Sequence, residues 1–447
     1  MTMSKGLGDK PPERVLTDIP RLLGAAGARL EAANREPAPQ RRHGVCLFLA
    51  RGRARVPAPG PRTPATVKLP ETAQDLAELL RRQALHYRTV LLEGNGTKRQ
   101  MAGPVEEADE HISTSGLNRV LDYQPRDLTI GVEAGVLWRD LTALLAGNRQ
   151  MVPLDPPFAD GATVGGVVAA NCSGPRRLLY GTPRDLVIGM QFATVEGHLV
   201  ESGGMVLRNV AGLDMAKLLI GSFGTLAAIA VVNFKLTGMP EVERTFLAPF
   251  PSAREAISAR DRILASGLRP SALDLLNPEA AQTVAGKVWL LAVRSGGNAA
   301  SVRRCQQHPA LRGSLALESE PQDTLWRQLE EFTPRFLAKR PHGVVVRVSC
   351  TLKELENVMA SFDGPAVARA GSGVCYGYFE QPVTAAEWLD RWAGRDWKAV
   401  IEFASGEDKP GLNLWPSPGG DFEIMQRVKR LFDPGIVLNR GRLYRLI

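Results

Sequence analysis

The stretch that decides the fold runs from Gly161 to Leu236 and contains three glycine-dense clusters: GATVGG at 161–166, ESGGMVLRNVAG at 201–212 and GSFGTLAAI at 221–229. Each cluster is set between apolar runs and not in a polar linker. Glycine allows a backbone to pass close to a ligand. We therefore expect a large ligand, such as a dinucleotide, to lie along the main chain here.

A helix, a strand and a glycine-rich turn are predicted before this stretch. From Glu71 the pattern is helical, with Thr72 as N-cap and Asp75 at the capping-box position. The inward face of this helix holds Leu76, Leu79, Leu80 and Ala84. The strand is TVLLE at 89–93, and the turn is GNGTKRQMAG at 94–103, which would suit a phosphate group.

Two common nucleotide-binding motifs are excluded. The Rossmann fingerprint G-x-G-x-x-G opens a helix, but Arg99 stands at its third glycine position and no helical pattern follows. The P-loop pattern G-x-x-x-x-G-K-[ST] does not occur. Asn-Gly is also a hairpin turn, so GNG by itself leaves a plain turn open.

Short strands should follow over 111–136, around a Pro-Arg-Asp turn and ending at Gly135. The sheet therefore continues past the first glycine turn. A helix should come next, with its inward face made of Trp138, Leu141, Leu144 and Leu145.

Six motifs in order carry a resemblance to a known family. They are PETAQDLAELL at 70–80, GNGTK at 94–98, STSGLNRVLDYQPRDLTIGVEAGV at 113–136, DGATVGGVVAANCSGPRRLLYGTPRDLVIGM at 160–190, RNVAGLDMAKLLIGSFGTLAAI at 208–229 and FDPGIVLNRGRLY at 432–444. The chain resembles the p-cresol methylhydroxylase/vanillyl-alcohol oxidase (PCMH-type) superfamily of FAD-binding proteins and, within it, the E subunits of bacterial glycolate oxidases.

The resemblance implies an α+β fold, in which a PCMH-type FAD-binding domain of two α/β subdomains carries a smaller α/β cap domain. We place the FAD domain at 65–238, the cap (substrate) domain at 239–425 and a C-terminal segment that returns to the FAD domain at 426–447. A chain of 447 residues is too long for one compact core, which agrees with this division. The cap strands should include 289–295, 343–349 and 374–380.

The candidate cofactor contacts fall in these motifs. FAD carries a pyrophosphate, and backbone N–H groups in glycine-bearing turns form nests for such an anion. The residues that fit this task are Gly94, Asn95, Gly96 and Thr97 on one side and Ala162, Thr163, Gly165 and Gly166 on the other. An alternative for Gly165 and Gly166 is that they only pack a helix against a strand.

Further contacts follow from the resemblance. It implies that Asn171, Ser173, Gly174, Tyr180 and Gly181 lie along the isoalloxazine or ribityl chain, that Gly135, Gly224, Thr225 and Ile229 also contact the cofactor, and that Asn209, Val210 and Ala211 form a neighbouring turn. A polar loop over 171–181 is the alternative. The chain departs from the family at Leu213, where an aromatic residue is usual, at Ala227, where a glycine is usual, and at Cys172, which replaces a small residue.

The net charge of +8 is concentrated near the N-terminus. Residues 1–66 hold twelve Lys or Arg and five Asp or Glu, so the rest of the chain is close to neutral. This pattern excludes a nucleic-acid partner. Residues 1–64 are a basic Pro/Arg-rich extension that ends in the linker VPAPGPRTP. Because the extension carries acids and has no long apolar run, we expect a cytoplasmic protein that meets a membrane only through partners.

The five cysteines form no C-x-x-C pair, and the six histidines are scattered singly. Iron–sulfur and zinc sites need closely spaced ligands, so we expect reduced thiols and no metal. No histidine or cysteine lies in the GNGTK or GATVGG turns. This predicts non-covalent FAD.

Oxidation of a 2-hydroxy acid requires a cation for the carboxylate and a base for the hydroxyl proton, while flavin takes the hydride. The cap offers Arg294 or Arg347 as the cation and His342 or Tyr378 as the base, although each is also an ordinary strand or loop residue. Related catalytic subunits carry the motif H-x-G-D-G-N-x-H, which this chain lacks. The sequence therefore assigns no catalytic residue.

Three functions stay open. The first is a FAD-binding subunit of a glycolate (2-hydroxy acid) dehydrogenase that works with a catalytic flavoprotein subunit and an iron–sulfur subunit. The second is a stand-alone FAD-dependent oxidoreductase on another alcohol or a lactone. The third is a flavin-free scaffold subunit. The resemblance favours the first.

Overall fold

The computed structural model describes residues 66–104, 107–205, 214–282, 284–445 and 447. The predictions for the extension at 1–64, for Leu213 and for the turn at Asn209, Val210 and Ala211 lie outside these residues. No helix in the described part is both long and apolar enough to cross a membrane.

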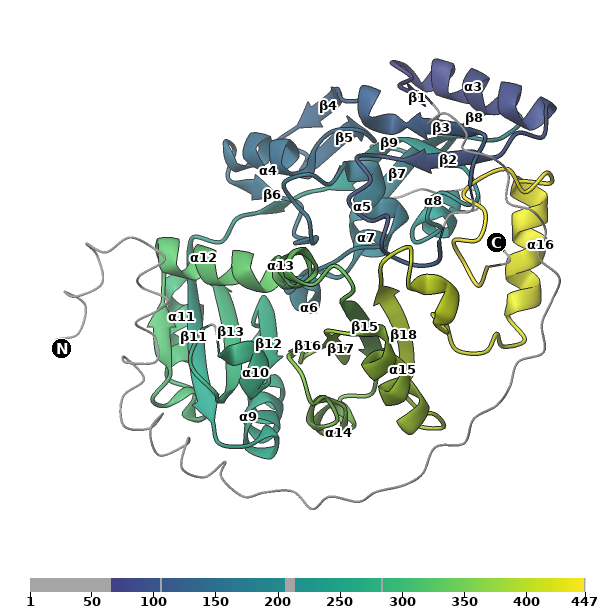
Figure 1. Cartoon of the computed structure of the whole chain (residues 1–447). Helices are drawn as coiled ribbons and strands as arrows, with labels where there is room; N and C mark the ends of the chain where they lie inside the picture. The colour runs from purple at the N-terminus through teal and green to yellow at the C-terminus, as the bar shows by residue number, and fades with distance from the viewer. Residues whose placement is uncertain (1–65, 105–106, 206–213, 283, 446) are drawn as a thin grey trace, which may run out of the picture.

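Two sheets form the upper body in Figure 1. The smaller is parallel, in the order β1 (Val67–Lys68), β3 (Glu110–Ser113) and β2 (Val90–Glu93). The larger is antiparallel, in the order β4 (Val120–Gln124), β5 (Thr129–Glu133), β9 (Ala228–Lys235), β7 (Val187–Ala193) and β8 (Leu199–Gly203). An antiparallel pair joins β6 (Gln150–Met151) to β10 (Thr237–Gly238).

The helices of this body begin with α3, where the predicted capping box is confirmed. The Thr72 hydroxyl accepts from the Asp75 N–H at 3.0 Å, and the Asp75 carboxylate accepts from the Thr72 N–H at 3.1 Å. The helices are α3 (Ala73–Leu85), η1 (Thr114–Gly116), α4 (Trp138–Ala146), α5 (Val164–Ala169), α6 (Arg177–Tyr180), α7 (Pro183–Leu186) and α8 (Met215–Leu219).

The inward face predicted for α4 is correct at three positions and wrong at one. Trp138, Leu141 and Leu145 are buried, but Leu144 is 41% exposed. Each residue turns the helix by about 100°. Leu144 therefore falls beside the buried stripe and faces solvent.

The lower body in Figure 1 is built on one antiparallel sheet of eight strands. Their order is β14 (Leu315–Leu317), β11 (Val242–Phe250), β13 (Trp289–Gly297), β12 (Ala272–Leu276), β16 (Ala366–Arg369), β17 (Val374–Phe379), β15 (Val344–Ser349) and β18 (Lys398–Phe403). The three strands predicted for the cap are β13, β15 and β17. This sheet has the most strands in the described residues, and the predicted smaller size of the cap domain stays a prediction. The domain boundary at 239 stays a prediction.

The cap helices flank this sheet. They are α9 (Ala253–Ala265), α10 (Pro278–Ala281), α11 (Ala299–Gln306), η2 (Pro309–Leu311), α12 (Ser319–Glu330), α13 (Phe332–Lys339), α14 (Leu355–Ala360), α15 (Pro382–Arg391) and η3 (Lys409–Gly411). The last helix, α16 (Phe422–Phe432), stands at the side of the molecule.

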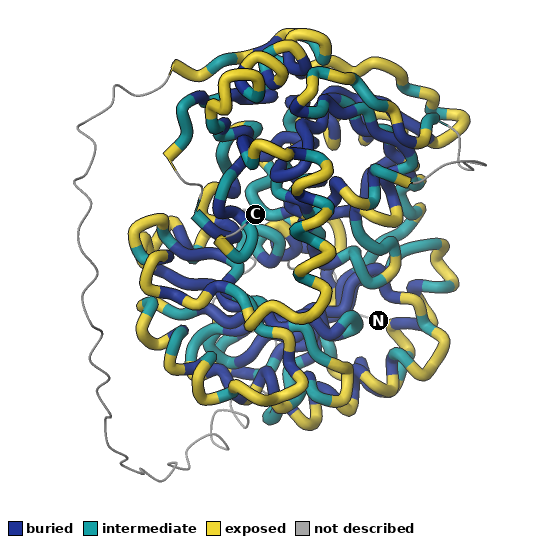
Figure 2. The backbone as a smooth tube through the Cα atoms, turned by 90° about the vertical axis from the view of Figure 1, so that its right-hand side faces the viewer, coloured by how far each residue is buried: buried dark blue, intermediate teal, exposed yellow. Residues whose placement is uncertain are grey.

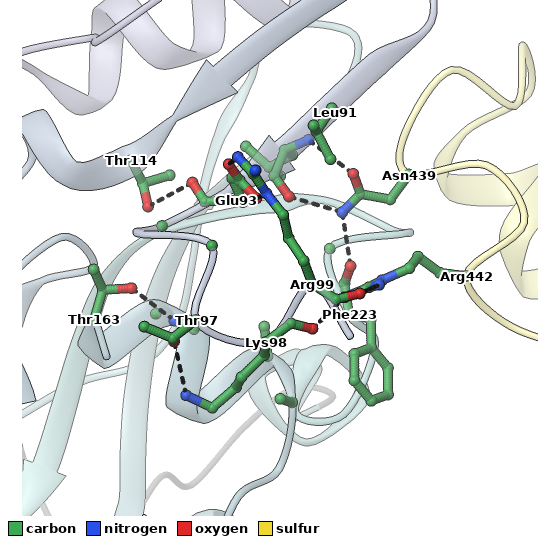
Figure 3. A pocket seen from close by; sticks show the side chains of 18 of the residues that line it. Leu91, Glu93, Thr97, Lys98, Arg99, Thr114, Thr163, Phe223, Asn439 and Arg442 are labelled. Carbon is green, nitrogen blue, oxygen red and sulfur yellow. Dashed lines mark hydrogen bonds and ion pairs between the residues drawn. The ribbon is translucent and has the colours of Figure 1, made fainter. Parts of the chain in front are cut away.

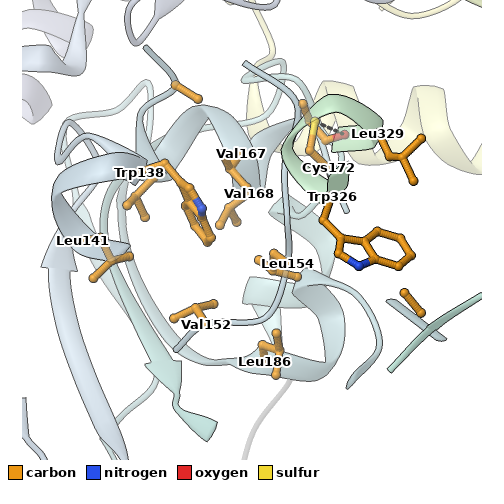
Figure 4. Close-up of a cluster of buried hydrophobic side chains, with 14 of the residues drawn as sticks. Trp138, Leu141, Val152, Leu154, Val167, Val168, Cys172, Leu186, Trp326 and Leu329 are labelled. Carbon is orange, nitrogen blue, oxygen red and sulfur yellow. Dashed lines mark hydrogen bonds between the residues drawn. The ribbon is translucent and has the colours of Figure 1, made fainter. Parts of the chain in front are cut away.

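One hydrophobic core joins the two bodies. It includes Trp138 and Val167 of the upper body together with Trp326 and Leu329 of α12 (Figure 4). Figure 2 shows the buried interior continuing between the bodies, with exposed backbone on the outer loops. The bodies are therefore packed together and not merely tethered.

Backbone pairing fixes this contact beside the first glycine turn. Met101 forms an antiparallel bridge with Phe403 at the end of β18. The Ala102 N–H donates to the Glu402 carbonyl at 3.0 Å, and the Ala404 N–H donates to the Gln100 carbonyl at 3.1 Å. The turn that follows β2 is thus held on the cap.

Candidate functional site

A cavity of about 500 Å³ lies at the turn after β2, the start of α5, the segment 223–229 and the C-terminal segment (Figure 3). The predicted cofactor-binding residues that line it are Gly94, Asn95, Gly96, Thr97, Thr163, Gly165, Gly166, Gly224 and Ile229. Two of the three glycine clusters therefore reach one cavity together with the GNGT turn. Ala227, the departure from the family glycine, also lines it.

The two predicted phosphate turns touch each other. The Asn95 amide donates to the Gly161 carbonyl at 3.1 Å. A Cβ atom at Gly94 would collide with the Thr163 side chain, so only glycine fits there. Thr163 is the N-cap of α5, and its hydroxyl accepts from the Gly166 N–H at 3.2 Å. Sequence positions almost seventy residues apart thus form one surface.

Three cations in the cavity wall are buried without an acidic partner. Lys98 donates to the Thr97 hydroxyl at 3.3 Å, and Lys409 donates to the Arg99 carbonyl at 3.3 Å. Arg442 donates to the carbonyls of Lys98, Arg99 and Gly103 at 3.0–3.1 Å. None of the three forms an ion pair with a carboxylate in the described part of the chain, and the Nε of Arg442 has no partner there.

Their surroundings disfavour the charged forms. Burial, followed by the nearby Arg442, lowers the pKa of Lys409 to about 7. Burial lowers the pKa of Arg442 to about 10 and also lowers the pKa of Lys98. Uncompensated buried cations are costly unless an anion accompanies them. The cavity therefore suits a ligand with anionic groups, and a dianionic pyrophosphate fits.

The acidic residue of this wall is already neutralised. Glu93 accepts from the Arg99 Nε at 2.8 Å and from the His111 Nε2 at 2.7 Å. The cavity thus keeps a positive balance on the side of Lys98, Lys409 and Arg442. Arg442 lies in the motif at 432–444, which is a usable signal, whereas Lys409 belongs to none of the motifs named above.

Three predicted cofactor residues are packed closely against other parts of the protein. A Cβ at Gly135 would collide with the Thr114 carbonyl, and one at Gly174 with the Asp155 carbonyl. Ala162 is fully buried, and its carbonyl accepts from the Trp138 N–H at 2.8 Å. None of these three residues lines either cavity described here.

Three more predicted residues line neither cavity, namely Thr225, Tyr180 and Gly181. Thr225 is buried, its N–H donates to the Ser222 carbonyl, and its own carbonyl accepts from Lys429 at 2.6 Å. Its backbone is therefore engaged inside the protein. Tyr180 ends α6, and Gly181, with φ of 86°, is the residue that lets the chain leave that helix.

A second cavity of about 370 Å³ adjoins the first, because Ala170 and Phe223 line both. The predicted residues Asn171 and Ser173 line this second cavity, as does Cys172. The cap contributes the side opposite them. Two of the sequence candidates for catalysis, Arg347 and Tyr378, are brought here.

The second cavity is rich in charge. The ionisable residues in its lining that the sequence did not single out are Arg177, Glu330, Arg369, Tyr376, Glu402 and Tyr444. Arg177 lies within the motif at 160–190 and Tyr444 within the motif at 432–444, and both motifs are usable signals. The others are single residues on cap elements, and only the fold brings them together.

Most of these groups have partners. Arg347 pairs with Glu402 at 3.0 Å, and Arg369 pairs with Asp274. The Tyr378 hydroxyl lies 2.9 Å from the Thr333 hydroxyl. Arg177 has no hydrogen-bond or ion-pair partner for its side chain among the described residues.

Burial shifts the pKa values of several groups in this cavity. It raises the pKa of Tyr376 to about 12 and that of Cys172 to about 11. It also raises the pKa of Glu402, against the effect of Arg347. The tyrosines and the thiol are therefore neutral at physiological pH.

The other two catalytic candidates lie elsewhere. Arg294 is buried and pairs with Glu243 at 2.7 Å, with its guanidinium 5.4 Å from the Trp326 ring centroid. His342 is 57% exposed and pairs with Asp408 at 3.0 Å. Neither lines the cavities.

Two family models match this chain. The FAD binding domain matches residues 64–203, and the C-terminal domain of FAD linked oxidases matches residues 239–384. The chain is a PCMH-type FAD-linked oxidoreductase. FAD is its cofactor, as predicted.

Named relatives of this oxidoreductase include glycolate oxidase subunits. Subunit GlcD of Bacillus subtilis is 28% identical over 214 residues, which cover 48% of this chain and 46% of that protein. Subunit GlcE of Escherichia coli is 32% identical over 178 residues, which cover 39% and 50%. The matches thus span about half the length of these two relatives.

A longer match is the mitochondrial D-lactate dehydrogenase [cytochrome] of Arabidopsis thaliana, 24% identical over 85% of this chain and 73% of that protein. Among solved structures, alkyldihydroxyacetonephosphate synthase superposes with a TM-score of 0.61 at 19% identity, over 83% of this chain and 75% of that one. This superposition confirms the predicted fold class. The oxidoreductase is thus similar in sequence both to glycolate oxidase subunits and to a D-lactate dehydrogenase.

Proposed function

We propose that this oxidoreductase is the FAD-binding subunit of a cytoplasmic glycolate (2-hydroxy acid) dehydrogenase, and that it works with a catalytic flavoprotein subunit and an iron–sulfur subunit. Bound FAD would accept a hydride from the alcohol carbon. The observation that carries the proposal is the arginine-bearing second cavity, which shares Ala170 and Phe223 with the FAD cavity.

The chemistry of that cavity supports a small hydroxy acid. A guanidinium binds a carboxylate through paired N–H donors. Arg177 lines the cavity and has no partner among the described residues, so it can hold a carboxylate without breaking an ion pair. A cavity of about 370 Å³ suits a small substrate.

The subunit role is supported by the likeness to GlcE and GlcD, whose names state that they are subunits of glycolate oxidase. It is also supported by the sequence, which lacks the histidine-rich motif of the catalytic relatives and any C-x-x-C pair for a cluster. A reduced flavin in this chain would therefore pass its electrons on through partners.

Steady-state dye reduction tests the proposal. The purified chain loaded with FAD should not oxidise glycolate or lactate at a useful rate, whereas the same chain co-expressed with a catalytic flavoprotein subunit and an iron–sulfur subunit should. Turnover by the lone chain at about 1 s⁻¹ or faster, as typical enzymes achieve, would contradict the subunit role.

A stand-alone oxidoreductase is the second candidate. It is favoured by one observation: the second cavity offers a free cation, Arg177, and a carboxyl, Glu330, from this chain itself. Dye reduction by the lone chain with an alcohol or a lactone would establish it. A flavin-free scaffold, the remaining alternative from the sequence, predicts a colourless purified protein.

A further inference from the structure

Two carboxyl groups line the second cavity, and they differ in their partners. Glu402 is paired with Arg347 at 3.0 Å. Glu330 forms no hydrogen bond or ion pair with its side chain anywhere in the described part of the chain. The neighbouring acids are also engaged, Asp155 with Arg176 at 2.7 Å and Asp274 with Arg369. Glu330 is therefore the carboxyl in this wall that is free to act on a ligand.

The fold holds Glu330 firmly in that wall. It is the last residue of α12, which is anchored by the buried Trp326, whose indole N–H donates to the Thr245 hydroxyl at 2.7 Å. The carboxylate of the next residue, Glu331, accepts a hydrogen bond from the Ala159 N–H of the FAD domain at 2.9 Å. The end of α12 is thus fixed on both sides of Glu330.

The charges around Glu330 come from several elements. They are Asp155 before α5, Arg176 at the start of α6, Arg177 in α6, Arg294 on β13, Arg347 on β15, Arg369 on β16, Tyr376 and Tyr378 on β17, and Glu402 on β18. Burial, with Asp155 adding to it, raises the pKa of Glu330 to about 8 despite the arginines. The carboxyl is consequently protonated at neutral pH and becomes a base above about pH 8.

We infer that Glu330 is the residue that accepts the hydroxyl proton of the substrate, an inference that rests on the proposed function. The substrate carboxylate binds Arg177. As the C–H bond breaks, bound FAD would take its electron pair as a hydride, the Glu330 carboxylate would accept the O–H proton, and a C=O bond would form. The products are a 2-oxo acid, reduced flavin and protonated Glu330, which returns its proton to solvent.

The experiment compares four proteins: wild type, Glu330→Gln, Glu330→Asp and Glu320→Gln, a control at an exposed residue in the first turn of α12. Each is loaded with FAD and assembled with its partners, and the catalytic flavoprotein subunit is prepared without flavin so that absorbance reports only the FAD of this chain. The rate of anaerobic FAD reduction by glycolate and D-lactate is measured against pH. In parallel, oxalate, a dicarboxylate that FAD cannot oxidise by hydride transfer, is titrated and its binding followed by flavin absorbance. The second measurement does not depend on turnover.

The wild-type rate should rise about tenfold per pH unit and level off above pH 8. The glutamine variant should reduce FAD about 10²- to 10⁴-fold more slowly, without this pH dependence. Glu330→Asp should keep part of the rate, and Glu320→Gln should keep the wild-type profile. A wild-type rate and profile in Glu330→Gln would overturn the inference.

Oxalate separates this inference from the proposed function. Ionisation of Glu330 adds a negative charge to the cavity, so wild-type affinity for oxalate should fall as pH rises through 8, and Glu330→Gln should lose that fall. Suppose that no hydroxy acid reduces FAD, but oxalate affinity falls through pH 8 in the wild type and not in Glu330→Gln. The proposed function and the catalytic role of Glu330 then both fail, while the position of Glu330 in an anion-binding site is supported. An oxalate affinity that does not change with pH in the wild type would also contradict the position of Glu330 in an anion-binding site.

Discussion

Gly165 and Gly166 are neighbours in α5, but they meet different surroundings. A Cβ at Gly165 would lie 2.7 Å from the Cβ of Ala134, and the Gly165 N–H donates to the Ala134 carbonyl at 2.7 Å. A Cβ at Gly166 would meet only the Thr163 hydroxyl, at 3.1 Å. Both residues line the cavity, but close packing against a strand requires glycine at Gly165 and leaves space at Gly166.

Replacement of Gly166 by valine should reduce FAD affinity while the protein still folds. The branched side chain fills space that the cofactor needs, and such overfilling costs about 1–3 kcal/mol. FAD occupancy and the dissociation constant are measured by absorbance and fluorescence. Gly238→Val is the control, since nothing lies within 4 Å of a Cβ there. Unchanged flavin content in folded Gly166→Val would place the pyrophosphate elsewhere.

Lys409 gives FAD binding a pH dependence. Its pKa without ligand is lowered to about 7 by burial and then by Arg442, and an anionic cofactor stabilises its charged form. Below pH 7 the lysine is charged before and after binding, so affinity is constant. Above pH 7 a proton must be taken up on binding, and affinity should fall by up to about tenfold per pH unit.

The apparent dissociation constant of FAD between pH 6 and 9 tests this prediction. Lys409→Met should flatten the profile and weaken binding at low pH. The exposed Lys235 provides the control, because Lys235→Met should leave the profile unchanged. A profile with the same slope in Lys409→Met would assign the proton to another group.

At the scale of elements, the C-terminal segment holds together parts that are far apart in the chain. The Asn439 carboxamide accepts from the Leu92 N–H at 2.8 Å and donates to the carbonyls of Leu92 at 2.9 Å and Phe223 at 2.8 Å. It joins the end of β2 to the segment before β9. This agrees with the predicted return of 426–447 to the FAD domain.

Asn439→Ala should destabilise the protein and weaken FAD binding. It leaves buried backbone groups unpaired, at about 1–3 kcal/mol each, and places alanine at a φ of 41°, which asparagine tolerates better. Thermal unfolding with and without FAD is the measurement. Asn357→Ala, which removes an exposed hydrogen bond to Glu354, should leave both quantities unchanged. Equal melting temperatures for the two variants would contradict the bridging role.

Local signals were enough to predict several elements. The Thr72–Asp75 capping box located α3, and apolar alternation located cap strands such as β15. Glycine clusters located the turns of the FAD cavity because steric exclusion is a property of the residue itself, as at Gly94.

Other site residues could not be found this way. Arg442 and the Arg99 carbonyl that it binds are 343 residues apart, and no local pattern encodes that contact. Glu330 ends an ordinary amphipathic helix and gains its significance from the arginines of other strands. Conversely, Gly135 and Gly174 have the residue type of a ligand contact but pack against the protein's own carbonyls.

At the scale of the whole molecule, FAD is held by shape and charge, and the predicted absence of a covalent link can be tested. The purified protein should be yellow, and acid or denaturant should release all of its flavin. Cys172 lines the neighbouring cavity, but burial raises its pKa to about 11, which keeps the thiol protonated and unreactive. Flavin that stays with the denatured polypeptide would contradict this prediction.

Removal of residues 1–64 should leave FAD binding intact. Every residue that lines the two cavities lies at or after Leu91. Flavin content and melting temperature of the truncated protein, compared with the full chain, are the measurements. Loss of FAD on truncation would show that the extension contributes to the domain.

The late positions of Asn439 and Arg442 in the sequence have a consequence for when FAD can bind during protein synthesis. The first glycine turn is synthesised early, but the cavity wall is completed only by residues such as Arg442, which lies 343 positions after Arg99 of that turn. At about 5–20 residues per second, synthesis of the intervening chain takes roughly 20–70 s. We therefore expect the complete cavity to exist only after this segment has been made, and cells starved of riboflavin should accumulate the polypeptide without its flavin.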